Sequence, residues 1–319
     1  MIRRRHFDIY IASCVQNGGI YHYKMADGKL QLSDVINLDQ PMYMAEEHCK
    51  MYIVLREPFE DKESGVIIYD KNSDGKLVKP SPIMPTRGRV ACHIMSVHGM
   101  IYCVNYLTGN VVRLPDMVVQ HIGRGVHPVR QTGPHVHFIG QTPDGKYLCV
   151  ADLGLDTIFL YNWDMTLYTK ASLPSGSGVR HLAFSEDGNF LFAVNELQST
   201  VAAFAYYSGQ LSFMDLCSTV PACFDGENAP AAIRVKDGNI YVSNRGHDSI
   251  ACLTFDGRTL TLVNCIACGG RTPRDFNFAD KYLLCANQDS DQVTVFDMED
   301  EFHIVDCLEI ERPFCILRS

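Results

Sequence analysis

The sequence of 319 residues predicts an all-β protein, a seven-bladed β-propeller with four antiparallel strands in each blade. Three observations support this fold class. A short apolar run that ends in a small or polar residue recurs seven times, at the spacing of about 40 to 50 residues that one blade needs. A second apolar alternation and turn-type residues follow the runs. The element that precedes each run appears once more at the C-terminus.

The recurring run is predicted to be the second strand of each blade. The seven copies end at Ser13, Leu55, Asn105, Asp152, Asn195, Asn244 and Asn287. Pairs such as Asp144-Gly145 and Asp187-Gly188 stand between the predicted strands. Such pairs supply the positive φ angles of tight hairpin turns. The runs and turns together predict successive hairpins, and no helical periodicity competes with them.

The innermost strand of each blade is predicted from a third element, which comes just before each run. Residues 179–181 and 273–275 are examples, and residues 313–315 are a copy with no blade after it. We therefore predict that this last copy supplies the innermost strand of the blade begun by residues 5–30, because such closure removes an exposed sheet edge. The whole chain, 1–319, is expected to form one propeller domain.

Charge and cysteine content exclude several functional classes. The net charge of −9 provides no basic field for nucleic acid or an anionic membrane surface. Thirteen cysteines, an odd number in a long chain, favour reduced thiols and a cytoplasmic location over a disulfide scaffold. Arginines at positions 3–5 precede an apolar stretch that Asp8 interrupts, which favours a strand over a signal peptide. We expect a monomer or weak homodimer.

Equivalent positions of the blades lie on common rings around the propeller axis. The first ring is predicted to contain Met42, Cys92, His135, Arg180, Ala231, Arg274 and Phe314. One residue further along, the second ring contains Tyr43, His93, Val136, His181, Ala232, Asp275 and Cys315. Charged residues near strand ends that face the axis are Arg180, Glu196, Arg234, Arg245 and Arg274. Unpaired charges there would be costly, and a purely structural ion pair does not need four arginines, so we expect a binding site.

Histidines add to the same predicted site. His93, His135, His137 and His181 all fall on neighbouring inner strands. His135 and His137 are two residues apart in the predicted strand, and the ring alignment assigns His135 to the ring. We therefore prefer His135 and keep His137 as a candidate. The strand-ending Asp and Asn residues are either ligands or turn residues that bond their own backbone.

Several segments resemble the lactonase family of seven-bladed propellers, which includes bacterial propeller-type 6-phosphogluconolactonase and fungal carboxy-muconate lactonizing enzyme. The matching stretches are 133–137 with 151–154, 180–184 with 194–197, 243–250, and 272–276 with 286–291. The resemblance implies a pocket near one end of the channel with His135, Arg180 and Glu196 as catalytic residues. Candidate substrate-binding residues are His93, His137, Asp152, His181, Arg234, Asn244, Arg245, Arg274 and Asn287. Ala232 stands where the family usually has glutamate, and Leu107-Thr108 where it has glycines, which puts the substrate's identity in doubt.

Opening a lactone requires an activated water and a fixed cation for the oxyanion. His135 or Glu196 is the expected base, Arg180 the expected cation, and Arg245 and Arg274 the expected anion holders. The predicted reaction is hydrolysis of an anionic sugar lactone, foremost 6-phosphogluconolactone of the pentose phosphate pathway, without a cofactor. Two alternatives stay open. One is a sugar-acid or keto-sugar lyase or isomerase with a divalent cation on His93, His135 and His181, and the other a non-catalytic propeller that binds a metabolite or protein.

Overall fold

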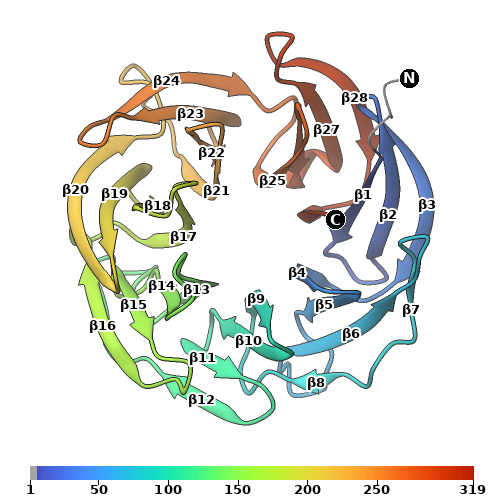
Figure 1. Ribbon diagram of the computed structural model, residues 1–319, viewed down its shortest axis with the longest axis horizontal. Helices are drawn as coiled ribbons and strands as arrows, with labels where there is room; N and C mark the ends of the chain where they lie inside the picture. Colours follow the sequence, from blue (N-terminus) through green and yellow to red (C-terminus); the bar gives the residue numbers. More distant parts are fainter. Residues whose placement is uncertain (1–5) are drawn as a thin grey trace.

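Seven antiparallel sheets surround a central channel in the computed structural model, which describes residues 6–319 (Figure 1). Blade 1 contains β29 (Pro313–Arg318), β1 (Phe7–Ser13), β2 (Gly19–Ala26) and β3 (Lys29–Asn37). Blade 2 contains β4 (Pro41–Glu47), β5 (Lys50–Leu55), β6 (Gly65–Lys71) and β7 (Leu77–Val78), and β8 (Met84–Pro85) also pairs with β6. Blade 3 contains β9 (Ala91–Val97), β10 (Met100–Asn105), β11 (Asn110–Arg113) and β12 (Met117–Gln120).

The other four blades follow in chain order. Blade 4 contains β13 (Val136–Gln141), β14 (Leu148–Asp152), β15 (Thr157–Tyr161) and β16 (Leu167–Ser172). Blade 5 contains β17 (Val179–Phe184), β18 (Phe190–Asn195), β19 (Thr200–Tyr207) and β20 (Gln210–Ser218). Blade 6 contains β21 (Ala229–Lys236), β22 (Asn239–Arg245), β23 (Ser249–Phe255) and β24 (Leu260–Ala267). Blade 7 contains β25 (Pro273–Ala279), β26 (Tyr282–Asn287), the 3₁₀ turn η1 (Gln288–Ser290), β27 (Gln292–Asp297) and β28 (His303–Glu309).

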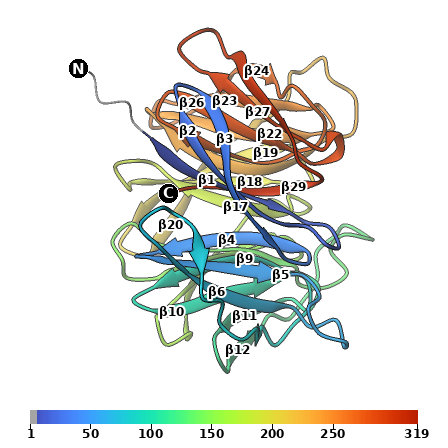
Figure 2. The ribbon, with the colours of Figure 1, turned by 90° about the vertical axis from the view of Figure 1, so that its right-hand side faces the viewer.

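The predicted ring closure is confirmed in blade 1. Strand β29 pairs antiparallel with β1, so the last strand of the chain is the innermost strand of the first blade (Figure 1). Figure 2 shows the ring from the side, with β1, β2 and β3 toward the viewer. The strand expected after the arginines begins at Phe7, and the arginines themselves lie outside the described residues. No helix in the described part of the chain is long and apolar enough to cross a membrane.

The second strand of each blade forms the centre of the hydrophobic packing. These strands are buried on both faces, because adjacent blades pack sheet against sheet, and they therefore read as continuous apolar runs. In β14, Val150 and Ala151 pack on opposite sides, in different apolar clusters. Six of the seven strands end at the predicted residue, and the seventh, β22, extends one residue further to Arg245. The seven-blade prediction is confirmed strand by strand.

Each innermost strand carries an irregularity of register near its first residues. The pairing of β17 with β18 skips from Val179 to His181 and leaves Arg180 as the extra residue. A bulge of this kind bends the strand and redirects a side chain. The corresponding extra residues of the other blades are Phe314, Met42, Cys92, His137, the pair Ala231 and Ala232, and Arg274. These residues form the first ring of the channel.

The ring alignment in blade 4 differs from the sequence-based expectation by two residues. Strand β13 begins at Val136, and its register skips from Val136 to Phe138, so His137 is the bulged residue. His135 lies before the strand and is not on the ring. The alignment on Pro134 was wrong because the connection into β13 adds residues ahead of the bulge. In the second ring, Phe138 accordingly replaces Val136.

Candidate active site

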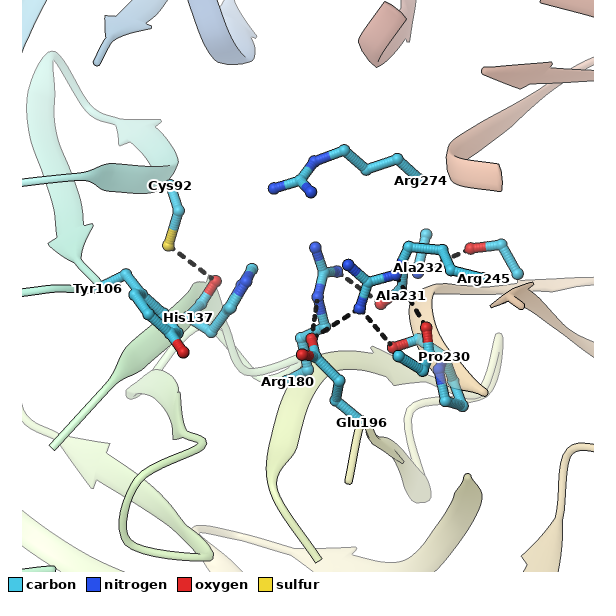
Figure 3. Close-up of polar contacts among 12 residues, drawn as sticks. Cys92, Tyr106, His137, Arg180, Glu196, Pro230, Ala231, Ala232, Arg245 and Arg274 are labelled. Atoms are coloured by element: carbon cyan, nitrogen blue, oxygen red, sulfur yellow. Dashed lines mark hydrogen bonds and ion pairs between the residues drawn. The ribbon is translucent and has the colours of Figure 1, made fainter. Parts of the chain in front are cut away.

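The first ring surrounds a small cavity in the central channel. Its lining includes Met42, Cys92, His137, Arg180, Arg274 and Phe314. The cavity volume of about 20 Å³ suits roughly one water molecule. Figure 3 shows the arginine side chains converging from one side, with His137 and Cys92 across from them. A sugar lactone therefore needs additional space next to this cavity.

Glu196, which follows β18, is the centre of an ion-pair cluster beside the cavity. Its Oε2 lies 3.0 Å from Nε of Arg180 and 2.8 Å from Nη2 of Arg245. Its Oε1 lies 2.5 Å from Nη2 of Arg130. Burial on its own would raise the pKa of Glu196, but Arg245 and Arg180 hold the pKa well below its usual range. Glu196 is therefore a carboxylate that orients arginines and a weak base near neutrality.

Arg180 is fixed inside the channel by the fold. Its Nη1 donates a hydrogen bond of 2.7 Å to the backbone oxygen of Ala231 in blade 6. Burial and the neighbouring Arg245 lower the pKa of Arg180 to about 10. The guanidinium remains charged at neutral pH and is immobilised at the cavity wall. This arrangement suits a group that must stabilise negative charge without reorganising.

Arg274 has no carboxylate within ion-pair distance among the residues that the structure describes. Its guanidinium carbon lies 4.0 Å from the ring centroid of Phe314, and its Nη1 donates to Oε1 of Gln288 at 3.2 Å. Burial, Arg180 and Arg245 lower the pKa of Arg274 to about 9. The cluster thus contains four arginines and one glutamate. Such an excess of buried positive charge is costly until an anion relieves it.

His137 provides a neutral imidazole opposite the arginines. Burial, followed by the charge of Arg180, lowers the pKa of His137 well below its ordinary value. The ring stands edge-on to Tyr106, with centroids 5.6 Å apart. A neutral imidazole can accept a proton, and a bound anion would raise its basicity. His137 therefore occupies the ring position that was expected of His135.

His135 has a different environment at the edge of the site. Its ring stacks on Tyr106 with a centroid separation of 4.5 Å, and its Nδ1 lies 2.9 Å from the backbone oxygen of Tyr106. Its backbone N–H donates to Oδ1 of Asp152 at 2.8 Å. His135 thus supports Tyr106 and does not line the cavity.

The second ring forms the floor of the cavity. The rings of Tyr43, His93, Phe138 and His181 pack with centroid separations of 4.2 to 5.4 Å. Burial, the largest effect, lowers the pKa of His93 to about 3 and that of His181 well below its ordinary value. Nη2 of Arg234 lies 2.9 Å from Oδ1 of Asp275. Arg234 faces the opening below this floor, so it is separated from the other arginines.

Three predicted ligands are fully buried in the blade contacts. Asn244 donates from Nδ2 to the backbone oxygen of Thr219 at 2.7 Å, and Asn287 donates to that of Cys268 at 3.0 Å. Thr219 lies in the connection that leads into blade 6, and Cys268 lies in the connection that leads into blade 7. Asp152 accepts the N–H groups of His135 and Gly154. Their polar atoms connect chain segments and do not line the cavity or the groove described next.

A larger groove adjoins the ion-pair cluster. Its volume is about 700 Å³, within the range of small-molecule sites. Glu196 and Arg245 form the wall that it shares with the cluster. Its other polar lining residues are His127, Arg130, Gln198, Ser199, Glu227, Asn228 and Thr272. These residues were missed because the repeat alignment covers strands only, yet the long connections 121–135 and 219–228, which carry four of them, were visible in the sequence.

The metal-dependent alternative requires several ligands at one point. In the described part of the chain there is no group of three or more His, Cys, Asp or Glu side chains that could hold a metal ion. His93 and His181 lie side by side in the floor, whereas His135 stacks on Tyr106 outside it. The three histidines proposed to share a cation are therefore not brought together.

Comparison with known proteins agrees with this architecture. Residues 8–307 match a family model described as lactonase, 7-bladed beta-propeller. The chain belongs to this lactonase family. Uncharacterized proteins of Staphylococcus aureus strains USA300 and N315 are 32% identical to it, over 92% of this chain and 93% of theirs.

Solved structures of the lactonase fold superpose over nearly the whole chain. A candidate 6-phosphogluconolactonase of Bacteroides fragilis is 26% identical, with a TM-score of 0.87 and 98% of each chain covered. A periplasmic gluconolactonase of Pseudomonas aeruginosa is 25% identical, with a TM-score of 0.88 and 99% of each chain covered. The resemblance inferred from the sequence motifs is thereby confirmed at the level of the family.

Proposed function

We propose that this protein hydrolyses the lactone of an anionic sugar acid, and that 6-phosphogluconolactone is the substrate to test first. The observation that carries the proposal is an excess of fixed arginines that lies between two features: the small cavity with the neutral His137 and a groove large enough for a sugar. Family membership and similarity to a gluconolactonase support the reaction class. The net positive cluster favours a substrate with a dianionic group over a neutral lactone.

The proposed reaction uses the two sides of the cavity for different tasks. The oxygen of a water molecule attacks the lactone carbonyl carbon while His137 accepts the water proton. Arg180 donates hydrogen bonds to the oxyanion of the tetrahedral intermediate. The ring C–O bond then breaks, and the leaving oxygen takes the proton from the His137 imidazolium. The product is the open-chain acid, and His137 returns to its neutral form.

The groove and the arginines would orient the substrate for this attack. The carbonyl lies at the cluster of Arg180, Glu196 and Arg245, and the rest of the sugar extends along the groove. Arg245 and Arg274 supply positive charge at the carbonyl end of the substrate. Glu196 keeps its arginines in place, which replaces its earlier expected role as the base. We further propose a cytoplasmic location and a role in sugar-phosphate metabolism, and the thirteen free thiols suit a reducing compartment.

The experiment is a pH-stat assay of 6-phosphogluconolactone and glucono-δ-lactone, corrected for spontaneous hydrolysis. We expect enzyme-dependent turnover of the phosphorylated lactone, its loss in His137→Gln, and its retention in His135→Gln. Treatment with a chelator should leave the rate unchanged. Turnover abolished by the chelator would favour the lyase or isomerase alternative. Tight binding of 6-phosphogluconate with no turnover of either lactone would favour a non-catalytic propeller.

A further inference from the structure

Arg130 differs from the other arginines of the cluster in its origin. Arg180, Arg245 and Arg274 belong to strands, whereas Arg130 belongs to the connection 121–135, the longest link between two blades of this structure. Its side chain is 38% exposed, compared with 7% for Arg180 and 17% for Arg245. It lines the groove at the point where the groove meets Glu196. Arg130 is therefore the cluster's arginine on the solvent side.

The guanidinium of Arg130 uses only one of its three nitrogens, Nη2, in hydrogen bonds to the described residues. Nη2 contacts both Oε1 of Glu196 and the hydroxyl of Tyr106, the latter at 3.3 Å. Nε and Nη1 make no hydrogen bond within the described residues. Glu196 is already paired through Oε2 with two other arginines, so the cluster does not need the full charge of Arg130 for neutralisation. A guanidinium anchored through one nitrogen can present its other N–H groups to a ligand.

The connection that carries Arg130 is held firmly. Asp152 bonds to both ends, through Nδ1 of His121 at 2.6 Å and the backbone N–H of His135. In the middle, the fully buried Gln131 donates from Nε2 to the backbone oxygen of Leu153 at 2.8 Å and to Asp156 at 2.7 Å. The side chain of Arg130 is thus presented from a preorganised segment, which lowers the entropic cost of binding.

We propose that Arg130 determines substrate specificity by binding the anionic group at the end of the substrate remote from the lactone carbonyl, a phosphate monoester. The inference rests on the lactonase function proposed above. Nη2 stays on Glu196 while the N–H groups of Nη1 contact the phosphate oxygens across the groove. The hydroxyl of Tyr106 contacts the same nitrogen, Nη2, and helps to hold the guanidinium in place.

The test compares Arg130→Gln with Arg124→Gln, a matched variant that removes an exposed arginine from the same connection and is not a partner of Glu196. Both variants are first checked for unchanged thermal unfolding. For Arg130→Gln we expect KM for 6-phosphogluconolactone to rise about 10- to 100-fold, the range for a hydrogen bond to a charged group. KM for glucono-δ-lactone should change less than about threefold, and Arg124→Gln should leave both values near the parent.

An equal loss on the two lactones would overturn the proposal, since it would mean that Arg130 acts only through Glu196. Damage of the same size from Arg124→Gln would overturn it as well. If the parent protein hydrolyses neither lactone, the proposed function fails, and calorimetric binding of 6-phosphogluconate and gluconate then tests Arg130 separately. Binding of 6-phosphogluconate weakened selectively in Arg130→Gln supports the anion site. Equal binding by parent and variant overturns it.

Discussion

The polar residues near the channel belong to two rings with different environments. The ring of strand-ending residues, such as Asn244 and Asn287, is fully buried, and its hydrogen bonds go to backbone groups of neighbouring connections. The ring of bulged residues, such as Arg180 and Arg274, has more charge than its neighbours neutralise. Both rings looked alike as candidate ligands in the sequence. Charge that is not neutralised therefore distinguishes the ring that we propose to bind the substrate from the ring that connects chain segments.

Among the residues of the bulged ring, Arg180 should have the largest effect on catalysis when it is replaced by alanine. Loss of an oxyanion donor costs about 2.7 to 4 kcal/mol, so kcat should fall roughly a hundredfold or more. Arg180→Lys keeps a charge but loses the planar donor pair, and it should recover only part of the rate. Turnover of the phosphorylated lactone is measured together with urea unfolding. Parental kcat in a folded Arg180→Ala protein would remove Arg180 from the chemistry.

The strand-end ring gives the complementary test, Asn287→Ala. Its Nδ2 also contacts Oγ1 of Thr294 at 3.1 Å, so the truncation removes two buried hydrogen bonds. We expect a loss of about 1 to 3 kcal/mol in the free energy of unfolding. Asn264→Ala, on the exposed side of β24, is the control and should have little effect. If Asn287→Ala instead weakens substrate binding at unchanged stability, the strand-end ring belongs to the site after all.

The sequence was informative wherever the repeat constrained the geometry. Blade number, strand ends and ring closure follow from seven apolar runs, because burial on both faces leaves little freedom in composition. His135 was placed on the ring in error because the connection into β13 adds residues ahead of the bulge. Spacing could have corrected it, since Arg180 precedes Asn195 by the same 15 positions that separate His137 from Asp152. Arg130 was not predictable, because connections between blades have no equivalent position in other repeats.

The floor of the cavity contrasts with both rings, because its histidines are buried without charge. His93 and His181 have pKa values lowered mainly by burial, whereas the unfolded chain protonates them near pH 6.5. Below that pH the unfolded state binds more protons, so stability falls as the pH drops. Each histidine contributes up to about 1.4 kcal/mol per pH unit. Urea unfolding between pH 7.5 and 5.0 should show that the free energy of unfolding falls with pH. In His93→Gln this dependence should be weaker by the contribution of one histidine. An identical slope in the variant would show that His93 titrates normally.

The smallest effect is expected for Arg274→Ala, which tests whether Arg274 and Arg180 have different roles in the bulged ring. Arg274 has no carboxylate partner in the described structure and stacks on Phe314, so it is placed to bind the carbonyl end of the substrate in the ground state without touching Glu196. Arg274→Ala should raise KM for the phosphorylated lactone about tenfold, which corresponds to about 1.4 kcal/mol, and should change kcat less. Steady-state kinetics on both lactones measure the split. A fall in kcat equal to that in kcat/KM would instead assign Arg274 to the transition state beside Arg180, and the bulged ring would then act as one catalytic unit.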